Sequence, residues 1–474
     1  MKKVVLVTLL CFLSFSSNAS LKNIAKDFLQ NNAQVKVAES QVELAALDVQ
    51  AFDLTRNTDL TWNSERNKNK LESFSAFAAR FAGGAFRQPI ETTRHSLSLN
   101  KDFTWGGTAA VTNTLQTVDV PGAQTIYGFT QGLSYTQNIG RDLFGRTFYL
   151  QKDQLNYNLG FTKANSESEI QNSLLSLVQN YYEAALQKSL VKLQSEAKER
   201  AVQRLNLIKR RVRDGLREKV DFIQAEISLY QADERVKSAE QNFTSAIERL
   251  STSVHRNVPA GEIVGLIDNS FAATKVPQGE VKDNQNLKAL NEQLKANKAT
   301  FDRSDLNLLP NININVQANS NNFDPKTSSA FSDGLVGSSN HEFIVGLNLT
   351  WALGSQPEKV EKTRALVNYN TSKLRLEKLT SDVAQTEKSI VDQVKLLDKN
   401  LESSKKRLSL AKAALKEYNR LYGRGRADLD QLIQAEETLI NTEINHVQYL
   451  SQRERLVHSL AFLYGSLRQF LIKE

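Results

Sequence analysis

The sequence predicts an α+β protein in which long α-helical coiled-coil hairpins alternate with sets of β-strands, arranged as an internal duplication. Three observations support this fold class. Apolar residues follow a heptad pattern through residues 357–422, stretches between the long helices alternate with a period of two, and the phrase IQAE recurs about 210 residues after its first occurrence. Each kind of element is therefore expected once in either half of the chain.

The 474-residue chain begins with a segment typical of a secretory signal peptide. Two lysines precede an apolar run from Val4 to Phe15, and small residues occupy the positions that signal peptidase reads, so cleavage is expected after Ala19. A buried N-terminal helix is the alternative, but the polar SSNAS that follows the apolar run disfavours it. Residues 1–19 are therefore predicted to be a signal peptide, and the mature chain is predicted to be exported.

The cysteine and hydropathy patterns limit the possible chemistry. The only cysteine, Cys11, lies in the predicted signal peptide, so disulfides, thiolate catalysis and cysteine-ligated zinc are excluded for the mature chain. After the signal there is no stretch of about 18 apolar residues that could form a transmembrane helix. In a membrane, such a chain could be placed only as a β-barrel.

The positive charge does not indicate nucleic acid as a partner. The net charge of +8 is spread over helices in which cations alternate with acids, and no nucleic-acid-binding motif accompanies it. The densest basic patch, KRRVRDGLRE at 209–218, is either a solvated helix end or a docking surface at a helix tip. The five histidines form no catalytic constellation with neighbouring acids, so no catalytic residue, metal ligand or cofactor is predicted.

Two very long helices are predicted, each followed by a returning helix. The first runs from about Gln154 to Arg213, and the second fills the segment from Pro357 to Tyr422. Each is followed by a glycine-bearing turn and by the IQAE phrase, so both pairs are predicted to be helical hairpins. The heptad seam of the second long helix consists of Val383, Ile390, Val394, Leu397, Leu401, Leu408, Ala411, Leu415, Tyr418 and Tyr422.

Six stretches alternate as half-buried strands do, four in the first half and two in the second. Their length of about 10 residues is typical of membrane-spanning strands, although a soluble α+β domain would give a similar pattern. The surplus of about 40 residues in the first half fits one additional hairpin turning at Trp105 to Gly107, so four and six strands both remain open. The stretches are 58–66, 95–105, 108–118, 127–139, 311–319 and 343–351.

The predicted organisation is a signal peptide followed by two structural repeats. Each repeat contains a helix, a set of strands and a long helical hairpin. The predicted bounds are 1–19 for the signal, 20–254 for the first repeat with about four strands at 58–140 and a tip near 214–221, 255–280 for a linker, and 281–474 for the second repeat with two strands at 311–352 and a tip near 423–430.

Four motifs in a fixed order carry a resemblance that covers essentially the whole mature chain. DGLREKVDFIQAE and YGRGRADLDQLIQAEETL stand at the two tips, LLPNININ at the second helix-to-strand junction, and TQNIGRDLFGR at the end of the first strand set. Their order and spacing resemble those of the TolC-like outer-membrane efflux proteins. The family's proline after the last strand is missing near LTWALGS.

The resemblance implies a homotrimeric membrane protein. Its hairpins would form a periplasmic helical barrel continuous with a transmembrane β-barrel shared among the protomers. Such a protein would be the outer-membrane exit channel of a tripartite efflux or type I secretion system, with a periplasmic adaptor, an inner-membrane transporter and outer-membrane lipid as partners. The alternative is a periplasmic structural coiled-coil protein without channel activity, which would leave the alternating strands without a purpose.

The resemblance also implies a gate at the hairpin tips. In the family, a tyrosine and an arginine of the second tip bond to an aspartate of the first, and Tyr422 and Asp221 match these positions. The arginine falls one position early, at Arg426, with Arg424 nearby. The family's acidic ring falls on Gln431 and Gln434, which are uncharged, while Asp428 and Asp430 are expected on other faces of the helix. Ordinary solvated helix-cap residues are the alternative interpretation.

Two further surfaces are predicted. The adaptor is expected to dock at the tips, at Gly215, Leu216, Gly423 and Gly425. Because indole rings favour the boundary of a membrane, Trp62, Trp105 and Trp351 are expected to form a girdle at the periplasmic interface. The phenylalanine-rich segment 72–86 has no predicted role.

Overall fold

The computed structural model of the chain describes residues 17–69, 90–119, 124–268, 271–336, 340–354 and 356–473. These residues divide into two compact units, the first made of three stretches of the sequence and the second of two. Unit 1 combines residues up to Val42 with Thr162–Leu290 and Arg375–Glu474, and unit 2 combines Glu43–Phe161 with Asn291–Leu374. The units do not coincide with the two predicted repeats, so the division into repeats stays a prediction.

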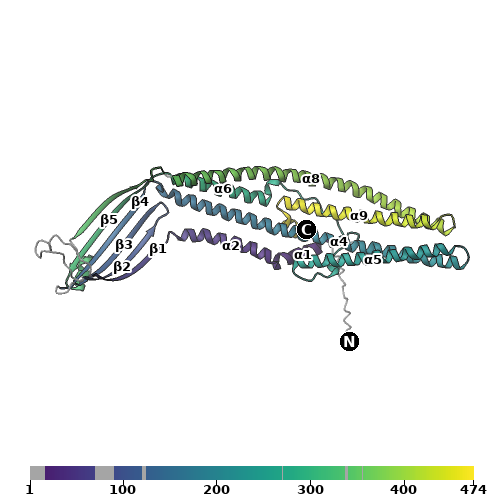
Figure 1. Ribbon diagram of the computed structural model, residues 1–474, viewed down its shortest axis with the longest axis horizontal. Helices are drawn as coiled ribbons and strands as arrows, with labels where there is room; N and C mark the ends of the chain where they lie inside the picture. Colours follow the sequence, from purple (N-terminus) through teal and green to yellow (C-terminus); the bar gives the residue numbers. More distant parts are fainter. Residues whose placement is uncertain are drawn as a thin grey trace, which may run out of the picture. The chain divides into compact units, whose positions relative to one another are not determined.

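Four strands of the first half and two of the second form one antiparallel sheet in unit 2 (Figure 1). Neighbours along the chain are neighbours in the sheet, in the order β1-β2-β3-β4-β5-β6. Of the two strand counts left open by the sequence, the described residues contain six. The strands are β1 Thr58–Asn69, β2 Ile90–Asp102, β3 Gly107–Asp119, β4 Ile126–Asn138, β5 Asn311–Asp324 and β6 His341–Thr350.

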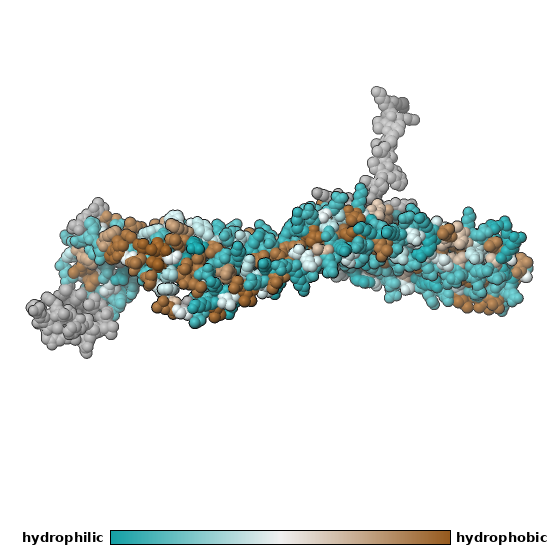
Figure 2. All heavy atoms as spheres, turned by 90° about the horizontal axis from the view of Figure 1, so that it is seen from above, coloured by the Kyte–Doolittle hydropathy of each residue, from teal (hydrophilic) through white to brown (hydrophobic). Residues whose placement is uncertain are grey.

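The two faces of the sheet differ in chemistry. Residues paired across strands share a face, and neighbours along a strand lie on opposite faces. One row of paired residues across all six strands is apolar: Leu60, Leu99, Val111, Leu133, Ala318 and Phe343. The adjacent row on the other face is polar except for Gly132, which stands between Thr112 and Asn319; its other members are Thr61, Ser98 and Glu342. Figure 2 shows hydrophobic residues gathered over the sheet.

The motif TQNIGRDLFGR forms the corner between β4 and the long helix α4, Arg146–Arg213. The side chain of Asn138 accepts hydrogen bonds from the backbone N–H groups of Gly140 and Asp142, at 3.1 and 2.9 Å. Asp142 then accepts from the backbone of Thr147 at 2.7 Å, in the first turn of α4. Gly145 has φ +75°, and a Cβ there would lie 1.8 Å from a carbonyl oxygen, so only glycine fits.

Two helical hairpins lie in or extend into unit 1 (Figure 1). The heptad prediction is confirmed, because six of the ten seam residues are buried and the other four are half-buried. Both turns contain a glycine with φ +70°, Gly215 and Gly425. The first hairpin pairs α4 with α5, Lys219–Val254, and the second pairs α8, Gln356–Gly423, with α9, Leu429–Leu463.

Shorter elements complete the two units. The main core of unit 1 includes Leu174, Leu177, Leu250 and Ile263, all fully buried, so the predicted linker 255–280 contributes to a packed core. The remaining helices are α1 Ser17–Asn31, α2 Ala33–Leu54, α6 Gln285–Leu306, α7 Thr327–Val336 and α10 Leu467–Lys473, with single 3₁₀ turns at Leu143–Gly145, Ala260–Glu262 and Val281–Asp283.

Two predictions fall outside the described residues. The signal peptide does so except for its last three residues, and the phenylalanine-rich segment 72–86 does so entirely. Within the part of the chain that the structure describes, none of the helices combines the length and apolar character needed to cross a membrane.

Candidate functional site

The tips of the two hairpins pack together around one tyrosine. Tyr422, in the last turn of α8, has only 1% of its surface exposed and belongs to a cluster of buried residues drawn from both hairpins. From the first hairpin the cluster includes Ile208 and Ala225, and from the second it includes Leu415 and Leu429. The tips are thus held together by burial of apolar surface as well as by the polar contacts around Tyr422.

Two arginines of the first hairpin flank the Tyr422 ring. The guanidinium carbon of Arg211 lies 5.2 Å from the ring centroid, and that of Arg217 lies 5.0 Å from it. Arg211 also donates hydrogen bonds to the carbonyl oxygens of Tyr422 and Gly423, at 3.0 and 2.8 Å. Arg217 donates to the carbonyl oxygen of Ala427 at 3.4 Å. Burial raises the pKa of the Tyr422 phenol despite these cations, so the ring is neutral at physiological pH.

The predicted bond between Asp221 and Tyr422 is not formed. The Tyr422 hydroxyl is buried and has no hydrogen-bond partner among the described residues. Asp221 pairs with Arg217, at 3.8 Å between Oδ2 and Nη1, and not with Arg424 or Arg426. Arg217 stands four residues before Asp221 and lies over Tyr422, so it takes the place expected for an arginine of the second tip. The gate assigned to these residues stays a prediction.

The polar residues at the start of α9 have separate roles. Asp428 is the N-cap residue, and its backbone N–H donates to the side-chain oxygen of Gln431 at 3.2 Å. Asp430 accepts a hydrogen bond from Gln224 of the other hairpin. Asp430, Gln431 and Gln434 all line one groove between α8 and α9. The expectation that Asp430 lies on another face was wrong, because residues four apart share a helical face.

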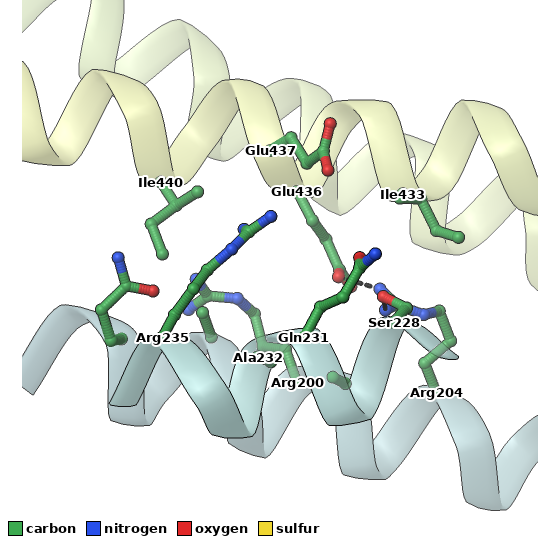
Figure 3. Close-up of a pocket in the computed structure, with 13 residues that line it drawn as sticks. Arg200, Arg204, Ser228, Gln231, Ala232, Arg235, Ile433, Glu436, Glu437 and Ile440 are labelled. Carbon is green, nitrogen blue, oxygen red and sulfur yellow. Dashed lines mark hydrogen bonds and ion pairs between the residues drawn. The ribbon is translucent and has the colours of Figure 1, made fainter. Parts of the chain in front are cut away.

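A buried ion pair joins the hairpins about two turns from Arg211. Arg204 of α4 pairs with Glu436 of α9, and its Nη2 donates to Ser228 Oγ of α5 at 2.6 Å (Figure 3). The two charged side chains are only 4% and 15% exposed. An ion pair this deep disfavours arrangements of the hairpins that separate its members, because a buried charge without its partner is costly.

The surroundings of this ion pair are polar and incompletely paired. Arg200 and Arg235 of the first hairpin line the same small cavity as Glu437 of the second. Two nitrogens of Arg200, Nε and Nη2, are buried without a hydrogen-bond partner among the described residues. Glu443, farther along α9, has one such oxygen, and burial raises its pKa. Buried polar atoms without partners reduce the free energy that stabilises this contact between the hairpins. An apolar interface of the same size would be more stable.

The first turn exposes one large apolar side chain, and one side of α5 exposes four more. A Cβ at Gly215 or Gly425 would meet no atom within 4 Å, and Leu216 is largely exposed. On α5, Val220, Ile223, Ile227 and Tyr230 are exposed at a spacing that places them along one side of the helix. The list of docking residues predicted at the tips, which also includes Gly423, stays a prediction.

The three tryptophans lie toward one end of the sheet, where β1 begins and β6 ends. Trp62 pairs with Leu97 on the apolar face, and Trp351 directly follows β6. Trp105 lies in the turn between β2 and β3, where its Nε1 donates to the hydroxyl of Tyr135 at 3.2 Å. Their assignment to a membrane interface stays a prediction.

Sequence reasoning missed four residues of the inter-hairpin contact. Arg211 and Arg217 belong to the basic patch 209–218, for which a docking surface was one of two interpretations. Arg204 stands three residues after the buried Ala201 and four before the buried Ile208. A charged residue at a core spacing is the signal that indicates a buried partner, here Glu436.

Within the described part of the chain, no cluster of histidine and acidic side chains is arranged to hold a metal ion. The arrangement at the tips is a set of polar contacts between two hairpins. It can hold two hairpins together through a small number of polar contacts that are individually breakable.

Comparison with known proteins gives a clear result at the level of the fold. Neither a protein-family model nor a curated protein sequence matches the chain. Solved structures do match over nearly its full length. They include the outer-membrane protein VceC of Vibrio cholerae, with a TM-score of 0.69 at 14% identity over 95% of this chain and 98% of that one.

Two further matches are described as outer-membrane channels. One is CmeC of Campylobacter jejuni, with a TM-score of 0.65 at 12% identity over 98% and 91% of the two chains. The other is the open state of MtrE of Neisseria gonorrhoeae, with a TM-score of 0.66 at 15% identity over 94% and 89%. The chain therefore has the fold of outer-membrane channels, and the TolC-like architecture predicted from its sequence is confirmed.

Proposed function

We propose that the protein is a trimeric outer-membrane exit channel of a tripartite efflux or secretion system, located in the outer membrane and extending into the periplasm. The observation that carries the proposal is the six-stranded sheet, which has an apolar face, an opposite face of hydroxyl and amide side chains, and two open edges. A lipid-facing side and a water-facing side alternate in this way in membrane barrels. No catalytic role is proposed.

The open edges of the sheet support the oligomer. Neither β1 nor β6 has a partner on its outer side among the described residues, and unpaired backbone groups are not tolerated in lipid. Pairing β6 of one copy with β1 of the next removes every edge. Three copies of six strands then give a barrel of about eighteen strands, within the range of known membrane barrels.

In this proposal the hairpin tips form the closed end of the duct. Arg211 and Arg217 tie the first hairpin to Tyr422 of the second, and opening requires these contacts to be broken. A hydrogen bond to a charged group contributes roughly 1.5–3 kcal/mol. Several such contacts per copy keep the duct closed, and binding of the adaptor at the tips would have to break them.

The first prediction tests channel and gate together. The double variant Arg211→Gln with Arg217→Gln removes the cations over Tyr422 and weakens the bonds to the second tip. We expect its single-channel conductance in planar bilayers to rise several-fold above that of the unmodified protein. The matched control is Arg213→Gln in the same turn, because Arg213 is exposed and its one ion pair among the described residues is with its neighbour Asp214, at 3.5 Å.

Equal conductance of the double variant and the Arg213→Gln control would show that Arg211 and Arg217 do not keep the channel closed. The absence of any channel from all three proteins, together with the absence of a heat-modifiable trimer in outer-membrane fractions, would instead favour a structural coiled-coil protein.

The second prediction concerns docking of the periplasmic adaptor at the tips. Gly215→Val and Gly425→Val place a β-branched residue at φ +70°, which costs roughly 1–2 kcal/mol or more and distorts the turn. We expect each variant to lose the adaptor in copurification after crosslinking, while the trimer still assembles. Gly261→Val is the control, because a Cβ there also meets nothing within 4 Å and φ is not positive. Undiminished recovery of the adaptor with both tip variants would contradict docking at the turns.

A further inference from the structure

The short helix α7 is fastened to one face of the sheet. It belongs to the connection between β5 and β6, and it packs on β4 and β5. Ala330 is fully buried, and a Cβ at Gly334 would lie 2.6 Å from the ring of Phe129. The amide nitrogen of Asn322 donates to the carbonyl oxygens of Ser329 and Ala330, at 3.1 and 3.5 Å. Two small residues four positions apart thus let the helix lie flat on the sheet.

The face that carries α7 is the apolar one. Phe129 pairs with Leu115 and with Asn322, and its ring meets that of Phe331 edge to face at 5.0 Å. Because Phe129 is four residues before Leu133 on β4, both side chains point to the same side of the sheet. The helix therefore extends the apolar face toward the end of the sheet opposite the tryptophans.

The outer side of α7 is divided between apolar and polar residues. Phe331 and Leu335 are one turn apart, and 48% and 43% of their surfaces are exposed. Ser328, Ser332 and Asp333 are also exposed, around the rest of the helix. A helix with a narrow apolar strip beside serines and an acid is suited to the boundary between water and hydrocarbon.

We propose that α7 is an interfacial helix that inserts Phe331 and Leu335 into the outer leaflet of the membrane, at the level of the lipid headgroups. The partner is lipid, because the exposed strip of α7 continues the apolar face on which Leu133 and Phe343 are largely exposed. The inference rests on the proposed function, which assigns that face to lipid. The helix would set how far the distal end of the barrel stands out of the membrane.

The experiment uses single tryptophans as depth reporters in the full-length protein. The three native tryptophans are replaced by phenylalanine, and one reporter is introduced at a time in vesicles of phosphatidylcholine brominated at shallow or deep acyl positions. Phe331→Trp and Leu335→Trp report the apolar strip of α7. Ser332→Trp is the matched control on the same helix, and Leu133→Trp is the reference on the sheet.

We expect shallow-brominated lipid to quench the Phe331→Trp and Leu335→Trp reporters at least as strongly as deep-brominated lipid does, and to leave the Ser332→Trp reporter close to its unquenched intensity. The Leu133→Trp reporter should respond most to the deep-brominated lipid. Quenching of the Leu133→Trp reporter without quenching of either strip reporter would overturn the placement of α7 and leave the channel proposal intact. A Leu133→Trp reporter that no lipid quenches would overturn the membrane assignment itself, and the inference with it.

Discussion

Replacing Arg204 by methionine is expected to lower the free energy of unfolding by about 3–5 kcal/mol, the usual cost of removing one member of a buried ion pair. The methionine fills much of the space of the arginine but leaves Glu436 charged and largely buried without its partner. Ser228 loses its hydrogen bond at the same time. Urea unfolding followed by circular dichroism at 222 nm measures the loss.

A second replacement tests whether Glu436 is the ion-pair partner of Arg204. The double variant Arg204→Met with Glu436→Leu removes both charges, and we expect it to recover most of the lost stability, since an apolar pair of similar volume is often as stable as a buried ion pair. Arg213→Met is the surface control, where a change below about 1 kcal/mol is expected. A loss at Arg204 no larger than at Arg213 would show that the pair is solvated and does not join the hairpins.

The second large effect is a dependence of stability on pH that comes from His458. Its ring is almost fully buried beside Tyr182 and Phe470, and its Nδ1 lies 2.8 Å from the carbonyl oxygen of Glu454, to which it donates as the neutral ring. Burial lowers the pKa of His458 from 6.5 to about 4. The unfolded chain therefore binds a proton at a higher pH than the folded chain does.

The difference between the His458 pKa in the folded and in the unfolded chain sets the direction and size of the change in stability with pH. The contribution of His458 is fully present above pH 6.5 and is lost as the pH falls toward 4, by about 3 kcal/mol in total. His458→Leu should remove this slope, whatever its effect on stability at pH 7. Burial raises the pKa of the nearby Glu454, which works in the opposite direction, so the wild type and the variant are compared at each pH.

His341, exposed at the start of β6, provides the control, since His341→Gln should leave the slope unchanged. An equal slope in the wild type and in His458→Leu would contradict the assignment. Unfolding midpoints in urea between pH 4 and 7 give the comparison.

The regular elements could be predicted because local pattern and tertiary packing agree. The heptad seam of α8 faces the core where the spacing places it, and both glycine turns fall at the ends of long helices. The stretches in which apolar and polar residues alternate form strands, because a period of two places the apolar residues on one face of a sheet and the polar residues on the other. The turn at Trp105 is closed by a hydrogen bond from the backbone N–H of Phe103 to the carbonyl oxygen of Gly107. The sequence indicated this additional hairpin only as one of two possibilities.

The polar contacts between hairpins could not be predicted in the same way. The choice of Arg217 over Arg424 or Arg426 depends on which side chains meet across two turns, and no periodicity encodes that. The helix α7 was missed for a related reason. Its ten residues include three serines and a glycine, and it is held by Phe129 and Asn322, which lie about 200 residues apart in the chain.

The helices α4 and α8 each contain 68 residues, and both are followed by a turn with glycine at φ +70°. Tyr422 meets Arg211 and Arg217 only while the two helices bring their ends to the same level. A deletion in one arm would shift that level by about 1.5 Å for every residue removed. Changes in the length of these arms are therefore expected to be tolerated only when they are paired, made in both arms and in steps of whole heptads.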